Sequence, residues 1–110
     1  MRVKTSWVAG GSGLVGGELL ELLLASDDFE TVIAVGRRPL PIQRLKLRQA
    51  TVDFADPASF EALGAPDVAF CCLGTTIKKA GSPDAFRAVD LDAVVNFARA
   101  ARAKGAKAFV

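Results

Sequence analysis

The chain has 110 residues, which suits one compact domain with its own hydrophobic core and excludes a two-domain enzyme. Hydrophobic residues make up 51% and charged residues 24%, a composition typical of a globular rather than a disordered or fibrous protein. The net charge of +2 is too small to indicate a nucleic-acid-binding surface. His and Tyr are both absent, so the chain offers no imidazole base, no His ligand for a metal and no phenolic acid.

The sequence predicts neither secretion nor membrane anchoring. Residues 1–5 lead directly into an apolar segment, without the apolar core and small-residue cleavage site of a signal peptide. Glu18 and Glu21 interrupt the longest apolar run, which is then too short to span a bilayer. Cys71 and Cys72 are adjacent in an apolar stretch, a pattern typical of buried reduced thiols and unsuited to a metal site. We therefore expect a cytoplasmic protein with no membrane partner and no metal.

The first half of the chain predicts the order strand, helix, strand, strand. Residues 7–9 end a first strand at a glycine cluster, and apolar residues recur at helical spacing over residues 14–25. Residues 31–35 form a β-branched run typical of a strand buried on both faces, and residues 47–54 show the weaker pattern of an outer strand. The apolar positions of the predicted helix are Leu14, Val15, Leu19, Leu22 and Leu23.

The second half predicts helix, strand, helix, strand. Residues 56–64 begin with a capping Asp followed by Pro and end with Gly, which indicates a short helix, and residues 67–73 form an apolar fourth strand. A long helix follows over residues 82–105, and residues 107–110 begin a fifth strand. The inward positions of the long helix are predicted to be Phe86, Val89, Ala93, Val94, Phe97 and Ala101. This order predicts an α/β fold with a doubly wound, Rossmann-like parallel sheet over residues 1–110.

The sequence ends inside the predicted fifth strand, so we expect the sheet to be incomplete at its C-terminal side. An ionised terminus is costly to bury. Either Val110 therefore lies at an exposed strand end, or the chain is part of a longer one. An exposed edge of such a sheet favours self-association or a protein partner.

The glycine cluster of residues 10–16 fits two phosphate-binding spacings at once. G-x-G-x-x-G would use Gly11, Gly13 and Gly16, and G-x-x-G-x-x-G would use Gly10, Gly13 and Gly16. In either case the glycines permit a tight turn, close approach of a pyrophosphate and close packing of the helix on the strand. The backbone N–H groups of residues 12–15 are then expected to face the anion. The alternative is a glycine-rich turn without a ligand. The candidate residues here are Gly10, Ser12, Gly13, Leu14, Val15 and Gly16.

The end of the second predicted strand selects between cofactors. An Asp or Glu at this point bonds the ribose 2′-OH of NAD, whereas this chain has Gly36, Arg37 and Arg38. Two guanidinium groups can pair with a 2′-phosphate, and no carboxylate is present there to repel it. We therefore expect NADP(H) rather than NAD(H), and disfavour S-adenosylmethionine, which has no phosphate for the arginines. The alternative is that both arginines lie in a solvated loop.

Two further segments supply candidate cofactor contacts. Asp53 could accept a hydrogen bond from the adenine amino group while Phe54 packs on the ring, or the pair could equally be an edge carboxylate beside a core Phe. Leu73, Gly74 and Thr75 follow the fourth strand. A glycine there would let the backbone approach the dinucleotide, and a Thr hydroxyl could reach its ribose or phosphates.

Several segments together resemble the Tat-interacting-protein family of atypical short-chain dehydrogenase/reductases. They are residues 10–16, 35–39, 52–54, 70–76 with 79–81, and 86–90, of which Cys-Cys-Leu-Gly-Thr-Thr is the most specific. The resemblance implies an NADP(H)-binding Rossmann domain. The cofactor would be held by Ser12, Gly13, Leu14, Val15, Arg37, Arg38, Leu73 and Gly74. The family has Ala where this chain has Gly11, a change that should leave phosphate binding intact.

The resemblance also implies where the catalytic residues lie. In the family, the Tyr and Lys of a Y-x-x-x-K motif and an assisting Ser follow the fifth strand, whereas this sequence ends within that strand and has no Tyr. No catalytic residue is therefore assigned. Two functions remain open: the NADP(H)-binding part of an oxidoreductase whose catalytic segment is absent from this chain, or a non-enzymatic redox-sensing module that acts through a protein partner.

Overall fold

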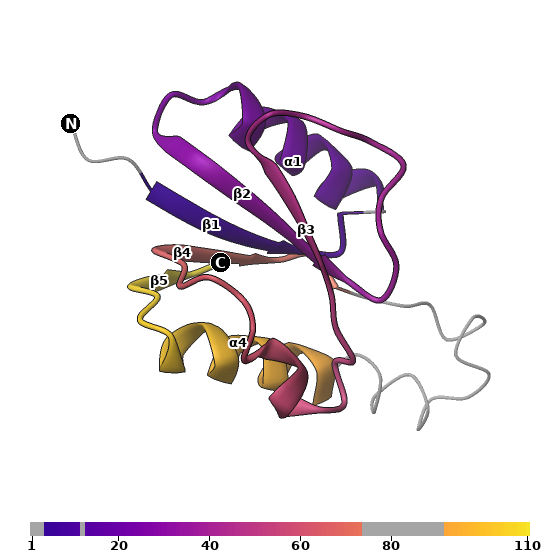
Figure 1. The fold of residues 1–110 in the computed structure, drawn as a ribbon, viewed down its shortest axis with the longest axis vertical. Coiled ribbons are helices and arrows are strands. Elements are labelled where there is room, and N and C mark those ends of the chain that lie inside the picture. Colours follow the sequence, from indigo (N-terminus) through magenta and orange to yellow (C-terminus); the bar gives the residue numbers. More distant parts are fainter. Residues whose placement is uncertain (1–3, 12, 74–91) are drawn as a thin grey trace.

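The computed structural model describes residues 4–11, 13–73 and 92–110. Within them the chain forms a five-stranded sheet in the order β3-β2-β1-β4-β5, and every neighbouring pair is parallel (Figure 1). The strands are β1 Lys4–Ala9, β2 Phe29–Gly36, β3 Leu47–Thr51, β4 Val68–Cys71 and β5 Ala108–Phe109, and the helices are α1 Leu14–Ala25, the 3-10 turn η1 Pro57–Phe60 and α4 Ala93–Ala103. The predicted Rossmann-like parallel sheet is confirmed.

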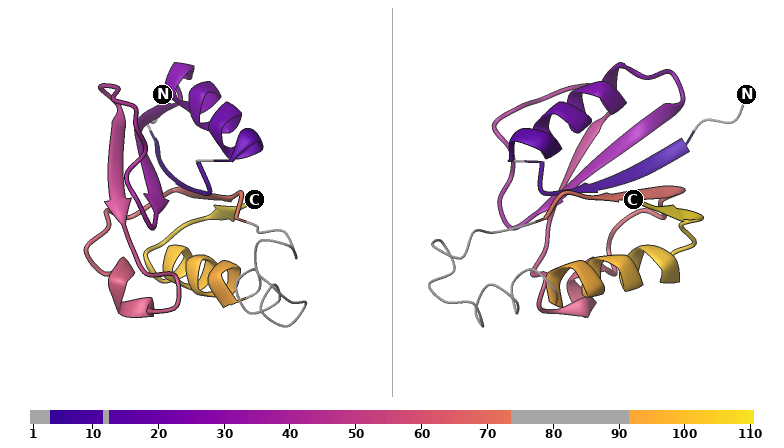
Figure 2. Two further views of the ribbon diagram at one scale, coloured as in Figure 1. Left: turned by 90° about the vertical axis from the view of Figure 1, so that its right-hand side faces the viewer. Right: turned by 180° about the vertical axis from the view of Figure 1, so that it is seen from behind.

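Helices cover both faces of the sheet. Helix α1 lies on one face, and α4 lies with η1 on the other (Figures 1 and 2). Strand β1 pairs with β2 on one side and with β4 on the other, so the order of the strands reverses at β1. In open α/β sheets the crevice at such a reversal, outside the carboxyl ends of the strands, is the usual place for a ligand.

The core on the α4 face is aromatic and centres on Trp7. This side chain is fully buried in the middle of β1, with its ring 5.8 Å from that of Phe97 and 6.3 Å from that of Phe60. Its indole Nε1 donates a hydrogen bond to the Gly64 carbonyl at 2.8 Å, so the one polar group of the side chain is satisfied. The cluster packs α4 and η1 against the central strand.

The core on the α1 face differs from the sequence prediction. Leu20 and Leu23 of α1 are buried against the sheet, whereas Leu14, Val15 and Leu22 are 81%, 71% and 70% exposed. The predicted apolar face of this helix is therefore wrong at those three positions. The reason is that Gly16 faces the strand, and the residues four and seven positions later, Leu20 and Leu23, lie on the same side of the helix.

Three element boundaries also differ from the prediction. Strand β3 ends at Thr51 rather than at residue 54, because the chain turns at Asp53, whose carbonyl accepts the Asp56 N–H at 2.9 Å. The predicted helix over 56–64 is only the turn η1, with Asp56 accepting the Ala58 N–H at 3.0 Å as its cap. Strand β4 is confined to residues 68–71.

In the long helix, the predicted inward positions Phe97 and Ala101 are confirmed as buried, and Ala93 packs against the same core. Its predicted start, with Phe86 and Val89, lies outside the described residues.

Replacement of Phe97 by Ala should destabilise the fold strongly. Phe97 is fully buried and contacts four aromatic rings. Removing a buried Phe side chain costs about 3–5 kcal/mol of unfolding free energy. The matched control is Leu45→Ala, because Leu45 is 96% exposed, and the change should stay within about 0.5 kcal/mol. Urea unfolding followed by Trp7 fluorescence measures both, and equal effects of the two changes would contradict the assignment of this core.

Candidate functional site

The turn between β1 and α1 forms a backbone cradle. Gly10 has a φ of +82°, which L side chains rarely adopt, and its carbonyl accepts the Gly13 N–H at 3.1 Å. Gly13 is the N-cap of α1, and its carbonyl accepts the Gly17 N–H at 2.8 Å, which is the first helical hydrogen bond. The N–H groups of residues 14–16 therefore have no acceptor within the helix and point beyond its N-terminus, as an anion site requires.

This geometry corrects the predicted set of anion-facing N–H groups. The Gly13 N–H is used inside the turn and does not face an anion. Leu14 and Val15 would take part through their backbone N–H groups, since their side chains extend into solvent. Ser12 lies outside the described residues.

The space around each glycine distinguishes the two possible motifs. A Cβ on Gly10 would lie 2.4 Å from the Cys72 carbonyl oxygen, and one on Gly16 would lie 2.0 Å from the Gly10 carbonyl oxygen, so both positions require glycine. A Cβ on Gly11 would meet only flexible side chains, the nearest being Leu40 Cδ1 at 3.1 Å. The structure therefore favours the G-x-x-G-x-x-G pattern of Gly10, Gly13 and Gly16, and Gly11 can be replaced by Ala.

A cleft opens beside this cradle at the carboxyl ends of the strands. Its volume of about 520 Å³ is within the range of small-molecule sites. It lies between the glycine turn, the end of β2 with the segment that follows it, and the residues after β4. The described lining residues include no Asp or Glu; they are Gly10, Gly11, Gly13, Ala34, Val35, Gly36, Arg37, Arg38, Pro39, Leu40, Pro41, Phe54, Cys72 and Leu73.

Arg37 and Arg38 supply the positive charge of the cleft. Both follow Gly36 at the end of β2, and both are exposed. Neither guanidinium forms an ion pair or hydrogen bond with another described residue, in contrast to Arg44, which pairs with Glu21 at 3.3 Å. The cleft wall therefore carries two cations that no other described residue neutralises.

Phe54 and Asp53 differ in their relation to the cleft. Phe54 is 8% exposed, its ring packs 5.9 Å from that of Phe60, and it also reaches the cleft. Asp53 does not line the cleft, and its Oδ1 accepts the Ala55 N–H at 2.9 Å. Asp53 thus bonds the turn through Oδ1, and its contact with an adenine amino group stays a prediction.

Of the residues predicted after β4, Leu73 lines the cleft. Gly74 and Thr75 lie outside the described residues.

Cys72 is a cleft residue that the sequence interpretation missed. Cys71 and Cys72 are both half-buried and form no disulfide with each other, rather than being fully buried thiols. Cys72 lines the cleft, and its backbone lies against Gly10. The signal that could have revealed it is its place directly after β4, since strand ends meet at this edge of a parallel sheet.

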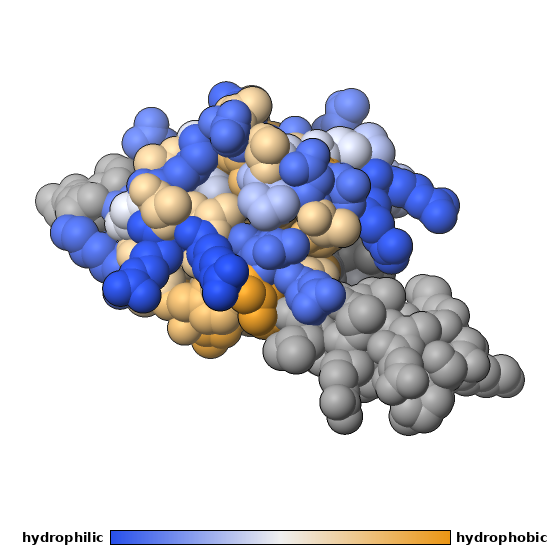
Figure 3. Space-filling model, turned by 90° about the horizontal axis from the view of Figure 1, so that it is seen from below, coloured by the Kyte–Doolittle hydropathy of each residue, from blue (hydrophilic) through white to orange (hydrophobic). Residues whose placement is uncertain are grey.

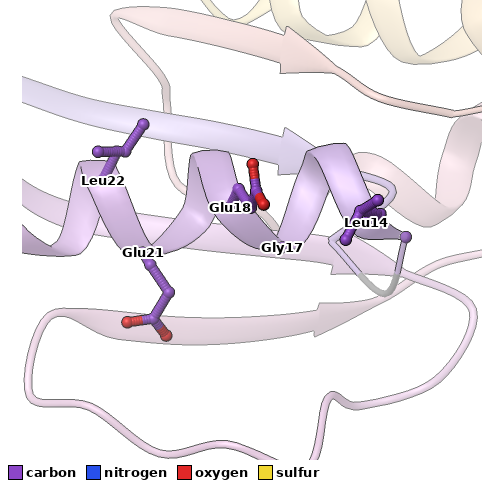
Figure 4. Close-up of a pocket in the computed structure, with 6 residues that line it drawn as sticks. Leu14, Gly17, Glu18, Glu21 and Leu22 are labelled. Atoms are coloured by element: carbon purple, nitrogen blue, oxygen red, sulfur yellow. The ribbon is translucent and has the colours of Figure 1, made fainter.

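A second hollow, of about 670 Å³, lies on the outer surface of α1. Figure 4 shows Leu14, Glu18, Glu21 and Leu22 along this helix. Glu21 pairs with Arg44, and the carboxylates of the helix would repel an anionic ligand. The hollow is formed by one exposed helix, without polar groups converging from several elements, and we do not assign a ligand to it.

Comparison with known families identifies the chain. Residues 7–110 match the NAD dependent epimerase/dehydratase family. The chain belongs to that family. The match covers the sheet, α1, the glycine cradle and α4, whose arrangement is that of a Rossmann domain.

Curated relatives confirm the predicted resemblance. The chain is 39% identical over 113 residues to Protein HTATIP2 of Rattus norvegicus, covering 99% of this chain and 46% of that protein. It is 35% identical over 121 residues to Protein FMP52, mitochondrial, of Coccidioides immitis, covering 98% of this chain and 49% of that protein. The chain thus spans about half the length of these relatives.

Solved structures confirm the fold. The uronate dehydrogenase from Agrobacterium tumefaciens superposes with a TM-score of 0.74 at 22% identity, over 94% of this chain and 38% of that one. A short chain dehydrogenase family protein from Francisella tularensis superposes with a TM-score of 0.72 at 17% identity, over 98% of this chain and 50% of that one.

The relatives overturn the expectation of a cytoplasmic protein. The FMP52 proteins of Coccidioides immitis, Aspergillus oryzae and Scheffersomyces stipitis are all named mitochondrial. The prediction of a cytoplasmic protein is therefore wrong. Among the helices of the described residues, none has both the length and the apolar character needed to cross a bilayer.

The glycines of the cradle should differ in their tolerance of Ala. Gly10→Ala and Gly16→Ala each place a Cβ against backbone and should lower the unfolding free energy by about 2 kcal/mol or more. Gly11→Ala meets only flexible side chains and should change it by less than about 1 kcal/mol. Thermal unfolding of the three variants measures this order, and a Gly11 variant as unstable as the other two would refute the G-x-x-G-x-x-G assignment.

Proposed function

We propose that this chain binds NADP(H) and forms the cofactor-binding part of an oxidoreductase of the atypical short-chain dehydrogenase/reductase kind. The observation that carries the proposal is the pair Arg37 and Arg38 on the wall of the cleft, unpaired with other described residues, with no acidic residue among the described lining. A ribose 2′-phosphate is the group of NADP(H) that such a pair would neutralise. The catalytic Tyr and Lys would lie outside these residues.

The described residues offer a partner for each part of this cofactor. The N–H groups of residues 14–16 would bond the pyrophosphate at the positive end of the α1 dipole. Gly13 has no side chain that would block the pyrophosphate. The nearest atom to a Cβ built at Gly13 would be the Gly10 carbonyl oxygen at 3.6 Å. Phe54 and Leu73 would supply apolar surface to the rest of the dinucleotide. The bound cofactor would supply or accept a hydride.

Solved relatives support a dinucleotide but not the choice of NADP(H). The uronate dehydrogenase from Agrobacterium tumefaciens has been solved complexed with NAD, and a short chain dehydrogenase from Leptospira borgpetersenii with bound NAD+. Both are below 25% identical to this chain, so they are similar to it in fold alone. The preference for NADP(H) therefore depends on the two arginines.

A non-enzymatic NADP(H)-binding or redox-sensing module is the second candidate. The 110 residues contain no Tyr, so the phenolic acid that the resemblance implies for a carbonyl substrate is not among them. Such a module would act through a protein partner, and it would bind the cofactor through the same residues. Cofactor affinity therefore tests what both candidates share, and turnover separates them.

We also propose that the β5 side of the sheet is covered by a further chain, either a second copy or a protein partner. Strand β5 pairs with β4 and with no other described strand, so it is an edge of the described sheet. Figure 3 shows strongly apolar side chains gathered at one margin of the molecule, with hydrophilic ones over much of the rest. An exposed strand edge with apolar neighbours favours such association.

The two arginines should determine the preference for NADPH over NADH. Arg37→Ala combined with Arg38→Ala should weaken NADPH binding by at least about tenfold, because charge-assisted hydrogen bonds contribute roughly 1.5–3 kcal/mol each and exposure reduces this. NADH affinity should stay within about twofold, since NADH has no 2′-phosphate. Titration of each cofactor by fluorescence measures both.

Arg44→Ala is the matched control, because Arg44 lies in the same loop but pairs with Glu21 away from the cleft. It should leave both affinities unchanged. A wild-type chain that does not prefer NADPH, or a double variant that keeps the preference, would refute the assignment of the 2′-phosphate.

The 110-residue chain alone should not reduce carbonyl compounds. It has no Tyr to protonate a developing alkoxide. NADPH consumption in the presence of a panel of ketones and aldehydes should equal that without them. Consumption that depends on the substrate and is lost in the double Arg variant would contradict this prediction.

A further inference from the structure

The segment between β2 and β3 connects the arginines to the α1 face of the sheet. After Arg38 the chain continues through residues 39–46, and Leu40 and Ile42 pack against the core beneath α1. Leu40 also lies beside the cradle, where its Cδ1 would be 3.1 Å from a Cβ on Gly11. The position of this segment therefore determines where the arginines stand relative to the glycine turn.

Prolines restrict how this segment can be held. Pro39 and Pro41 have no backbone N–H, so the segment cannot pair with a neighbouring strand through a regular hydrogen-bond ladder. Leu40, between them, has one N–H and one carbonyl group that need partners. One side chain that both accepts and donates can satisfy the two groups together and fix the backbone in place.

Gln49 of β3 supplies these bonds. Its Oε1 accepts the Leu40 N–H, and its Nε2 donates to the Leu40 carbonyl at 2.9 Å and to the Ile42 carbonyl at 3.1 Å. The side-chain amide thus replaces the missing strand pairing. Gln49 is paired with Ala34 of β2 in the sheet, so it is anchored to the strand that delivers the arginines.

We propose that Gln49 is a positioning residue that holds Arg37 and Arg38 at the cleft and thereby sets the preference for NADPH over NADH. The proposal rests on the proposed function. Arg38 is separated from Leu40 only by Pro39, whose φ is fixed by its ring, so anchoring the Leu40 backbone restricts the path of the chain at Arg38. Gln49 itself does not line the cleft and would act only through the segment it holds.

The test is Gln49→Met, which keeps the length of the side chain and removes all three hydrogen bonds. NADPH affinity should fall by about fivefold, as expected if the segment holds its binding-competent position for about one fifth of the time. NADH affinity should change by less than about twofold, because the arginines contribute to it little. Gln49→Thr, which suits a strand but is too short to reach Leu40, should behave in the same way.

Two controls separate positioning from a general loss of structure. Gln43→Met changes an exposed glutamine of the same segment whose side chain makes no described bond, and it should leave both affinities unchanged. In the Arg37→Ala and Arg38→Ala background, Gln49→Met should have no further effect on NADPH affinity, since a double-mutant cycle reveals whether the residues act together.

The outcomes that overturn this proposal differ from those that overturn the proposed function. An unchanged NADPH affinity in both Gln49 variants would show that packing of Leu40 and Ile42 holds the segment without the amide. If Gln49→Met lowered NADPH and NADH affinity equally, both in the wild-type chain and in the double Arg variant, the role of Gln49 would be merely structural. A wild-type chain without a preference for NADPH would instead refute the proposed function before any Gln49 variant is measured.

Discussion

The arrangement of the site depends on one close approach, that of α1 to the end of β1. A Cβ at Gly16 would lie 2.0 Å from the Gly10 carbonyl oxygen, so the helix packs closer to the strand than any other residue would allow. This contact sets the rotation of α1. With Gly16 turned inward, Leu20 and Leu23 face the sheet, and Leu14 and Leu22 are left in solvent although they are equally apolar. The same contact brings the N-terminus of the helix to the edge of the cleft.

The aromatic core on the α4 face supports this edge of the sheet. Trp7 lies in β1 two residues before Ala9, the last residue of the strand, and it is held between Phe60 and Phe97. Phe54 extends the same aromatic cluster to the cleft. The cradle therefore lies on a packed core, while the charged groups lie on the segment after β2, which meets the core at Leu40 and Ile42. Loops carried by such a scaffold are where binding residues are usually found.

The sequence predicted most of the fold and placed the glycines and arginines at strand ends. These features could be predicted because a glycine motif and a β-branched strand are each recognised from a short run of neighbouring residues. It did not predict which leucines of α1 face inward, since that depends on the distance between Gly16 and Gly10. It also left Asp53 open between two roles, because only the turn after β3 shows that its carboxylate serves Ala55. The bonds of Gln49 to Leu40 could not be anticipated, as they connect residues nine positions apart across an irregular segment.

The glycine motif and the arginines carry different kinds of information. Gly10 and Gly16 are required by the folded backbone whether or not a ligand binds, so their presence is evidence for this turn rather than for a cofactor. Arg37 and Arg38 have no described partner within the chain, and two like charges side by side oppose each other. Nothing in the described fold requires them there. The arginines, and the amide that we propose holds their segment, are therefore the features through which the choice of cofactor is to be understood.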